Sequence, residues 1–189
     1  MSAARGTLHI EPQVARRTLN IARDRFVNTV VGRIVTQQEL VALVAADRAA
    51  GKTIALANGC FDLLHVGHAR YIAGAAAEAD RLIVAINDDE SVALLKGAGR
   101  PIIPAAERAE LVAAFSVVDY VVVFSGHGPT ALLAALKPDV HCKGTDYTVE
   151  TVPERDIVRA YGGRTAIVGD EKAHSTRDLL AVIKDRVRR

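Results

Sequence analysis

The sequence contains no tryptophan, and only four phenylalanines and four tyrosines stand among its 189 residues. Half of the residues are nevertheless apolar, so we expect a core built from small aliphatic side chains. The sequence also has no large excess of one sign of charge, because it contains 24 lysines and arginines and 22 acidic residues. Proteins that bind nucleic acid usually combine a strongly basic face with stacking aromatics. The composition therefore predicts no nucleic-acid partner.

Cysteine is equally scarce. Cys60 and Cys142 form no CxxC pair and have no His/Cys cluster around them. Two such residues predict buried free thiols in a reducing compartment rather than a disulfide or a zinc site. No apolar run approaches the ~20 residues that a membrane-spanning helix needs. The N-terminus lacks the apolar stretch of a signal peptide, so we expect a cytoplasmic protein that does not interact with membranes.

Two common nucleotide-binding motifs, GxGxxG and GxxxxGK[ST], are absent. What the sequence does have, from Lys52 onward, is a regular alternation of short apolar runs and helical patterns. This alternation is typical of a parallel sheet covered on both faces, and it predicts an α/β fold with a Rossmann-like, doubly wound, five-stranded parallel sheet. We expect strands at 53–58, 81–87, 119–124, 139–143 and 164–169, and helices at 67–79, 105–115, 129–136, 153–161 and 175–187.

The N-terminal region differs from this pattern. Residues 14–31 place apolar side chains at helical spacing with arginines between them, which predicts an amphipathic helix. Thr36 and Glu39 then have the spacing of a capping box and predict the start of a new helix. We therefore expect a helical extension over residues 1–33 and a single α/β domain over 34–189.

The loop after the first predicted strand carries the main functional pattern, NGCFDLLHVGH, at residues 58–68. Gly59 permits a tight turn that exposes backbone N–H groups. The helix that starts near Val66 adds further unpaired N–H groups and the positive end of its dipole, which together favour an anion. His65 and His68 are three residues apart and can lie on one face of that first turn. Imidazoles in this position can donate hydrogen bonds to phosphoryl oxygens, so the loop predicts a polyphosphate site.

Two other interpretations of the histidines are open. Two histidines on one helical face can bind zinc, but a zinc site needs further ligands, and no convincing third ligand lies nearby in the sequence. The histidines can also be structural, with their hydrogen bonds satisfied inside the fold. The position of HxGH directly after the first strand, with GCFD before it, favours the phosphate site.

The segment N-G-C-F-D-L-L-H-V-G-H resembles the signature of the HxGH nucleotidyltransferase superfamily. The similarity continues through DRLIVAINDDESV, LKGAGRPIIP, KPDVHCKGTDYTVE and HSTR, and covers residues 34–187. Within the superfamily this order is similar to the adenylyltransferase domain of bacterial ADP-heptose synthesis enzymes. The resemblance implies transfer of AMP from ATP, with Mg²⁺, to D-glycero-β-D-manno-heptose 1-phosphate. Pyrophosphate is then released, and the product, ADP-heptose, serves lipopolysaccharide core assembly.

The resemblance also implies roles for single residues. His65, His68 and Lys96 are expected to act in catalysis with Asp62, which can orient a histidine, hold a lysine or reach the magnesium. By composition alone, Asp62 is equally a helix cap and Lys96 a solvated surface lysine. Mg²⁺ is expected to be held mainly by the ATP phosphates. The nucleotide is assigned to Gly59, Cys60, Phe61, Gly67, Arg108, Asp146, Ser175 and Thr176, and the second substrate to Asn87, Arg100, Lys143 and Gly144.

Further expectations concern partners and competing functions. The resemblance implies a homodimer, and the few residues before the domain imply that a separate sugar kinase supplies the heptose 1-phosphate. Thr145 stands where the family has a second glycine, and Arg177 follows Ser175 and Thr176 where the family has a threonine. Three alternatives therefore stay open: a cytidylyltransferase acting on glycerol 3-phosphate, an FAD-synthetase-like enzyme acting on FMN, and a catalytically silent nucleotide-binding module.

Overall fold

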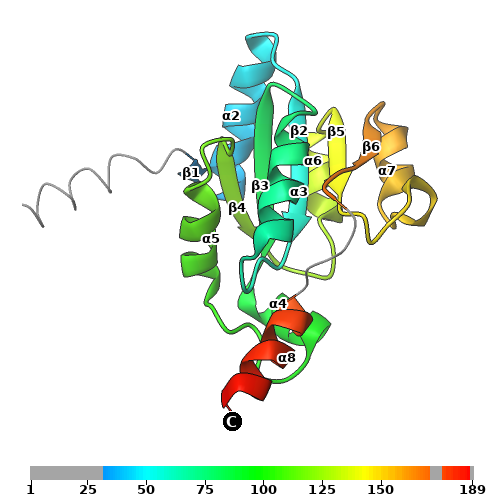
Figure 1. Cartoon of the computed structure of the whole chain (residues 1–189). Coiled ribbons are helices and arrows are strands. Elements are labelled where there is room, and N and C mark those ends of the chain that lie inside the picture. Colours follow the sequence, from blue (N-terminus) through cyan, green and yellow to red (C-terminus); the bar gives the residue numbers. More distant parts are fainter. Residues whose placement is uncertain (1–31, 171–175, 188–189) are drawn as a thin grey trace, which may run out of the picture. The chain divides into compact units, whose positions relative to one another are not determined.

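A computed structural model describes residues 32–170 and 176–187, which belong to the unit Val31–Arg189. The helix expected at 14–31 lies outside the described residues. A single sheet forms the centre of this unit (Figure 1). Its strands are β1 (Arg33–Ile34), β2 (Ile54–Gly59), β3 (Arg81–Asn87), β4 (Tyr120–Phe124), β5 (Val140–Lys143) and β6 (Arg164–Ile167). They are arranged in the order β1-β4-β3-β2-β5-β6, and every neighbouring pair is parallel.

The expected α/β class is confirmed, but the expected number of strands is wrong, because the sheet has six strands rather than five. The additional strand, β1, has only two residues and pairs with β4 through Arg33–Tyr120 and Ile34–Val121. Both β1 residues are exposed. A two-residue strand with no buried side chain leaves no apolar run in the sequence, so periodicity could not predict it.

Helices cover both faces of the sheet. One face packs against α3 and α5, and the other packs against α2, α6 and α7. The sequence did not predict α4, a short helix that follows β3. The helix expected at 153–161 is present as the shorter α7, and a 3-10 turn that was not expected precedes it. The helices are α2 (Gln37–Ala49), α3 (Val66–Ala76), α4 (Asp89–Lys96), α5 (Ala105–Ala113), α6 (Thr130–Leu136), η1 (Val149–Thr151), α7 (Arg155–Ala160) and α8 (Thr176–Val187).

The alternation of side chains along β2 divides the core in two. Ala55 and Ala57 pack toward α3 and α5, whereas Ile54 and Leu56 pack toward α2 and α6. The small side chains on the α3 face agree with the composition-based expectation of an aliphatic core. By the same alternation, the side chain of Asn58 points to the α6 and α7 face of the sheet.

The strand order defines where a ligand can bind. From β2 the chain continues to β3 and β4 on one side of the sheet, and it then crosses to β5 and β6 on the other side. The topological switch point therefore lies between β2 and β5. Open α/β sheets bind ligands in the crevice beyond the carboxyl ends of the strands at such a point. The loop after β2, which contains the paired histidines, begins at this position.

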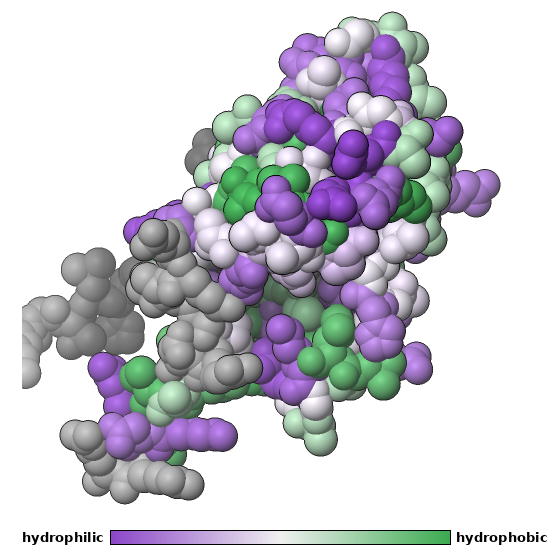
Figure 2. All heavy atoms as spheres, turned by 90° about the vertical axis from the view of Figure 1, so that its right-hand side faces the viewer, coloured by the Kyte–Doolittle hydropathy of each residue, from purple (hydrophilic) through white to green (hydrophobic). Residues whose placement is uncertain are grey.

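The β6 side of the unit is mainly polar. Figure 2 shows hydrophilic residues around small, separate apolar patches over the described part of this face. Arg164, at the start of the edge strand β6, is exposed and pairs with Glu78 at 2.6 Å. Charged residues of this kind oppose unwanted pairing at a sheet edge. Among the helices in the described ranges, none is long and apolar enough to cross a membrane.

Candidate active site

The two histidines lie side by side at the start of α3. His65 is the N-cap residue, with an extended backbone (φ −140°, ψ 171°) that ends the loop after β2. Its backbone N–H donates to Nδ1 of His68 over 3.4 Å, and the two ring centroids are 3.9 Å apart. Both residues are half-buried. The structure thus brings the rings together at the carboxyl end of β2, beside the switch point.

The environment of His68 fixes its protonation state. Because Nδ1 accepts a hydrogen bond, the ring hydrogen of the neutral form is on Nε2. Burial, followed by the nearby charges of His65 and Lys96, lowers the pKa of His68 from 6.5 to about 4. His68 is therefore neutral at pH 7. It can donate one hydrogen bond from Nε2 to a phosphoryl oxygen, but it brings no positive charge to the site.

The buried ring of Phe61 packs against the ring of His68 from the core of the domain. Its side chain is 1% exposed, and its ring centroid lies 5.3 Å from that of His68 and 6.3 Å from that of Tyr71. A Cβ atom at Gly59 would lie 3.2 Å from the Phe61 ring, so the glycine leaves room for it. Phe61 was expected to bind nucleotide, but its buried ring cannot stack on a base. Only its backbone, with φ +49°, remains as a contact for a ligand.

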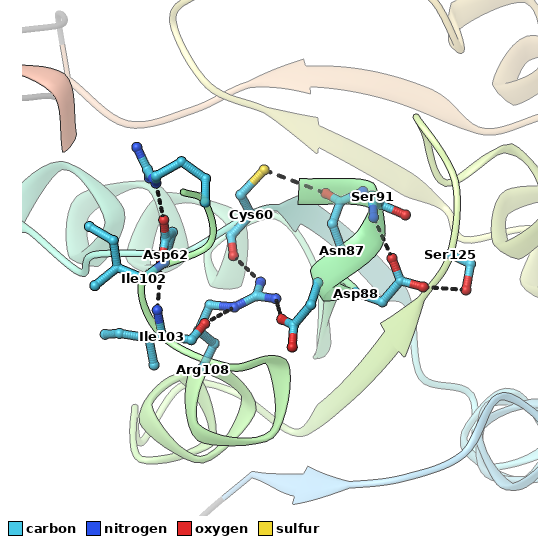
Figure 3. Close-up of polar contacts among 11 residues, drawn as sticks. Cys60, Asp62, Asn87, Asp88, Ser91, Ile102, Ile103, Arg108 and Ser125 are labelled. Carbon is cyan, nitrogen blue, oxygen red and sulfur yellow. Dashed lines mark hydrogen bonds and ion pairs between the residues drawn. The ribbon is translucent and has the colours of Figure 1, made fainter. Parts of the chain in front are cut away.

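Asp62 binds the loop before α5 (Figure 3). Its buried carboxylate accepts hydrogen bonds from the N–H groups of Ile102 (2.7 Å) and Ile103 (3.0 Å) and forms an ion pair with Arg100. Burial acts to raise the pKa of Asp62, but the hydrogen bonds from Ile103, Arg100 and Ile102 outweigh it and hold the pKa below its usual value. Both carboxylate oxygens are thus engaged. These contacts favour a positioning role over the magnesium contact that the sequence suggested, and they also occupy Arg100.

Arg108 connects three segments in the same region (Figure 3). Its side chain is 0% exposed, and it donates to the carbonyls of Cys60 and Ile103 and to Oδ1 of Asp89 at 2.8 Å. The family resemblance implied that Arg108 contacts the nucleotide. Its buried position instead makes it a support that links the loop after β2 to α4 and α5.

Asn87 is also engaged inside the protein. It is 3% exposed, its Nδ2 donates to the carbonyl of Gly126 at 3.0 Å, and its Oδ1 accepts from Cys60 Sγ at 3.9 Å. Asn87 therefore ties the ends of β3 and β4 together, and no open face remains for the second substrate that it was expected to bind. Burial raises the pKa of the Cys60 thiol. Asp88 caps α4 by accepting from the Ser91 N–H at 2.8 Å.

Lys143 ends β5 directly beside Asn58. The ammonium group is 3.2 Å from Asn58 Oδ1, 3.3 Å from Glu154 Oε2 and 5.2 Å from the centroid of the Tyr147 ring. Lys143 and Glu154 are both 7% exposed. His141, two residues earlier on β5 and fully buried, places Nε2 3.1 Å from the same Asn58 oxygen. The sequence predicted Lys143 as a ligand of the substrate, and the structure shows it within a buried polar cluster.

The other expected site residues differ in exposure. Lys96 is the last residue of α4; it is exposed, and its charge is near enough to contribute to the lowered pKa of His68. Gly67 is half-buried in the first turn of α3, and Thr176 begins α8. Thr145 donates to the carbonyl of Asp170 at 2.7 Å. Gly144 and Asp146 follow β5, where Asp146 is exposed, and Ser175 lies outside the described residues.

No group of three or more His, Cys, Asp or Glu side chains that could hold a metal ion occurs among the residues that the structure describes. Both cysteines are free; Cys142 is buried as expected, whereas Cys60 is only half-buried.

Sequence reasoning missed four residues that organise this region: Tyr71, Asp89, His141 and Glu154. A signal existed for His141, because positions two apart on a strand share one face and Lys143 had already been selected. For Glu154 and Asp89 no local pattern exists, since each meets its partner through an irregular loop or a neighbouring helix. Tyr71 is a buried helical residue whose hydroxyl donates to the Cys142 carbonyl at 2.8 Å.

The doubly wound sheet, with paired imidazoles at a strand-to-helix corner beside its switch point, defines a nucleotide-binding α/β domain of the HxGH type. Comparison with known proteins gives the family. The profile of the cytidylyltransferase-like family matches residues 56–187, and the chain belongs to this family.

Two curated relatives agree with this family assignment. The chain is 43% identical to the bifunctional protein HldE of Syntrophotalea carbinolica over 154 aligned residues. The alignment covers 82% of this chain and 31% of that protein. It is 46% identical over 153 residues to HldE of Halorhodospira halophila, 81% of this chain and 32% of that protein. The chain thus spans about a third of the length of these relatives. They confirm the resemblance that the sequence suggested, and with the family they indicate a nucleotidyltransferase.

A solved structure supports the fold. The lipopolysaccharide core biosynthesis protein of Thermoplasma volcanium matches with a TM-score of 0.55 and 22% sequence identity, over 65% of this chain and 100% of that chain. At this level of identity the match concerns the architecture alone.

Proposed function

We propose that this protein transfers AMP from ATP to D-glycero-β-D-manno-heptose 1-phosphate and releases pyrophosphate. The observation that carries the proposal is the pair of histidine rings, 3.9 Å apart, at the carboxyl end of the strand beside the switch point. The HldE relatives support the choice of ATP and of the heptose phosphate. Residues 34–189 form the catalytic domain in this proposal, and residues 1–33 are an extension of it.

In the proposed reaction an oxygen of the sugar phosphate attacks the α-phosphorus of ATP. The bond from that phosphorus to the bridging oxygen of the β-phosphate breaks, and pyrophosphate leaves with the bond electrons. The acceptor is already an anionic nucleophile, so the protein's part is positioning and charge stabilisation. His68 donates from Nε2 to the phosphoryl group under attack, and the adjacent His65 ring contacts the same phosphates. The exposed ammonium of Lys96 supplies the positive charge that the neutral His68 lacks.

The remaining residues divide by their contacts. Gly59, Cys60, Gly67 and Thr176 present backbone groups at the ends of β2 and at the starts of α3 and α8, where an anion is favoured. Gly144 and Asp146 lie beyond β5, beside the same crevice, and suit ribose or sugar hydroxyls; Ser175 keeps its expected phosphate role. Residues whose polar atoms are engaged inside the protein hold the site in shape. These are Asp62, Asn87, Arg100, Arg108 and Lys143.

The proposal includes further components. Mg²⁺ enters with ATP as part of the substrate complex and is held mainly by the phosphates. A sugar kinase supplies the heptose 1-phosphate, the active form is a homodimer, and the reaction takes place in the cytoplasm.

The proposal is tested by pyrophosphate release from the purified chain. ATP and CTP are each combined with heptose 1-phosphate, glycerol 3-phosphate or FMN, with Mg²⁺ and with a chelator. We expect turnover only with ATP, heptose 1-phosphate and Mg²⁺. Turnover with CTP and glycerol 3-phosphate, or with ATP and FMN, would replace the substrate assignment. ATP binding without turnover on any acceptor would favour a silent nucleotide-binding module.

A further inference from the structure

The buried cluster on the α7 side of the switch point contains a carboxylate that the proposed mechanism does not use. Glu154 is the N-cap residue of α7 and is 7% exposed. Its Oε2 lies 3.3 Å and its Oε1 3.5 Å from Nζ of Lys143. Charged side chains are rarely buried to this extent without a partner, and here each is the partner of the other.

The ion pair acts on the residue that precedes the histidine loop. Lys143 donates to Oδ1 of Asn58 at 3.2 Å, and Asn58 is followed directly by Gly59. Burial and the charge of Lys143 lower the pKa of His141 to about 3. His141 is therefore neutral and donates to the same oxygen from Nε2 at 3.1 Å. Asn58 Oδ1 thus accepts one hydrogen bond from a cation and one from a neutral ring.

Asn58 is held from the other face of the sheet as well. Its backbone N–H donates to the hydroxyl of Tyr71, on α3, at 3.2 Å, and that hydroxyl donates to the carbonyl of Cys142 at 2.8 Å. Asn58, the second-last residue of β2, is therefore fixed by β5 on one face and by α3 on the other. The loop at Gly128 is also close to the ion pair, because a Cβ atom at that glycine would lie 2.8 Å from Glu154 Oε1.

We propose that Glu154 is a positioning residue of the transfer reaction, acting through Lys143 and Asn58 on the loop that carries His65 and His68. This inference rests on the proposed function for its kinetic consequences. Without the carboxylate, the buried ammonium has only an amide oxygen and an aromatic ring as partners. It then moves toward water, and Asn58 loses its charged donor. The end of β2, from which the histidine loop starts, is then held less firmly.

The test compares Glu154→Gln with Glu154→Asp, which keeps the carboxylate, and with Glu150→Gln, an exposed glutamate of the same region, as the control. We expect Glu154→Gln to lower kcat roughly 10–100-fold with little change in KM for ATP, the range typical of lost outer-shell support at active sites. Glu154→Asp should recover most of the loss, and Glu150→Gln should match the wild type. Unchanged kcat in Glu154→Gln overturns the inference.

A double variant separates positioning from simple charge balance. Lys143→Met with Glu154→Gln removes both charges, so we expect it to regain the melting temperature that Glu154→Gln loses, while kcat stays low. Recovery of kcat together with stability would mean that the pair only balances its own charges, and the inference would be wrong.

Hydrogen–deuterium exchange gives a readout that needs no turnover. We expect faster exchange of the backbone amides at residues 59–65 in Glu154→Gln than in the wild type or in Glu150→Gln. If the wild type is inactive on every substrate pair but this exchange still responds, the proposed function fails and the positioning role stands. If the wild type is active and neither exchange nor kcat responds, the positioning role fails.

Discussion

At the scale of single residues, the paired histidines make the strongest prediction. His68→Ala removes a neutral donor from the reacting phosphoryl group, and we expect kcat to fall by ~10²–10³, as when one preorganised donor is lost elsewhere. The fold should persist, since His68 is only half-buried. Steady-state pyrophosphate release measures the effect, and circular dichroism checks the fold. His127→Ala, at an exposed histidine in the loop after β4, is the control. Equal kcat in His68→Ala and His127→Ala would contradict the mechanism.

The protonation of two histidines, His141 and His68, predicts how the stability of the fold depends on pH. Burial lowers the pKa of His141 from 6.5 to about 3 and that of His68 to about 4. Both stay neutral in the folded protein at a pH where the unfolded chain already takes up protons. Their contribution to stability is therefore complete above about pH 6.5 and declines as the pH falls from there toward the folded values.

The measurement is urea unfolding between pH 7 and 5, above the usual range of carboxylate titration. We expect the free energy of unfolding of the wild type to fall more steeply over this window than that of His141→Asn, which cannot take up this proton. Parallel curves for the two proteins would show that His141 is not held neutral by burial.

At the scale of elements, Arg108 joins the loop after β2 to α4 and α5. Arg108→Met would leave the carbonyls of Cys60 and Ile103 without their donor and Asp89 without its partner. We expect a loss of about 3 kcal/mol in the free energy of unfolding, since each buried acceptor left unpaired costs about 1–3 kcal/mol. Chemical denaturation measures it. Arg155→Met, which breaks an exposed pair with Asp156, should cost far less. Equal losses in both variants would contradict the role of Arg108.

Elements also show what the sequence could predict. The strands β2, β3 and β4 are largely buried and mainly apolar, and the apolar runs of the sequence located them together with the shorter, more polar β5 and β6. The capping box of Thr36 and Glu39 is present as expected, with the Glu39 N–H donating to Thr36 Oγ1 at 3.2 Å. Helix α4 was missed because its eight residues follow β3 directly and are too few to show a clear helical period. The missed contacts of Asp62 and Arg108 depend on which loop folds over which strand, and no local pattern encodes that.

At the scale of the whole molecule, the order of the strands could not be predicted from the sequence, although this order determines which residues meet at the site. Alternation of strands and helices predicts a parallel sheet and places ligands at its carboxyl edge. It does not say which two strands flank the switch point. The pairing of β2 with β5 brings Asn58 and Lys143 together although they lie 85 positions apart. Because the strand order was not known, several residues that were expected to contact the substrate are instead buried beneath the neighbouring strands and loops. Lys143, Asn87 and Arg108 are examples.

The chain divides into residues 1–30 and the unit Val31–Arg189, which carries the proposed site. The family match begins at residue 56, and every proposed site residue lies between Asn58 and Thr176. A domain with its own core folds without its neighbours, so we expect removal of residues 1–31 to change kcat by no more than about twofold. Removal of residues 1–36 is the matched comparison, because it also takes away β1 and the Thr36 cap. Losing that cap should lower the free energy of unfolding by about 1 kcal/mol or more. Pyrophosphate release and thermal unfolding measure both variants, and a large loss of activity in the shorter truncation would mean that residues 1–31 belong to the catalytic unit.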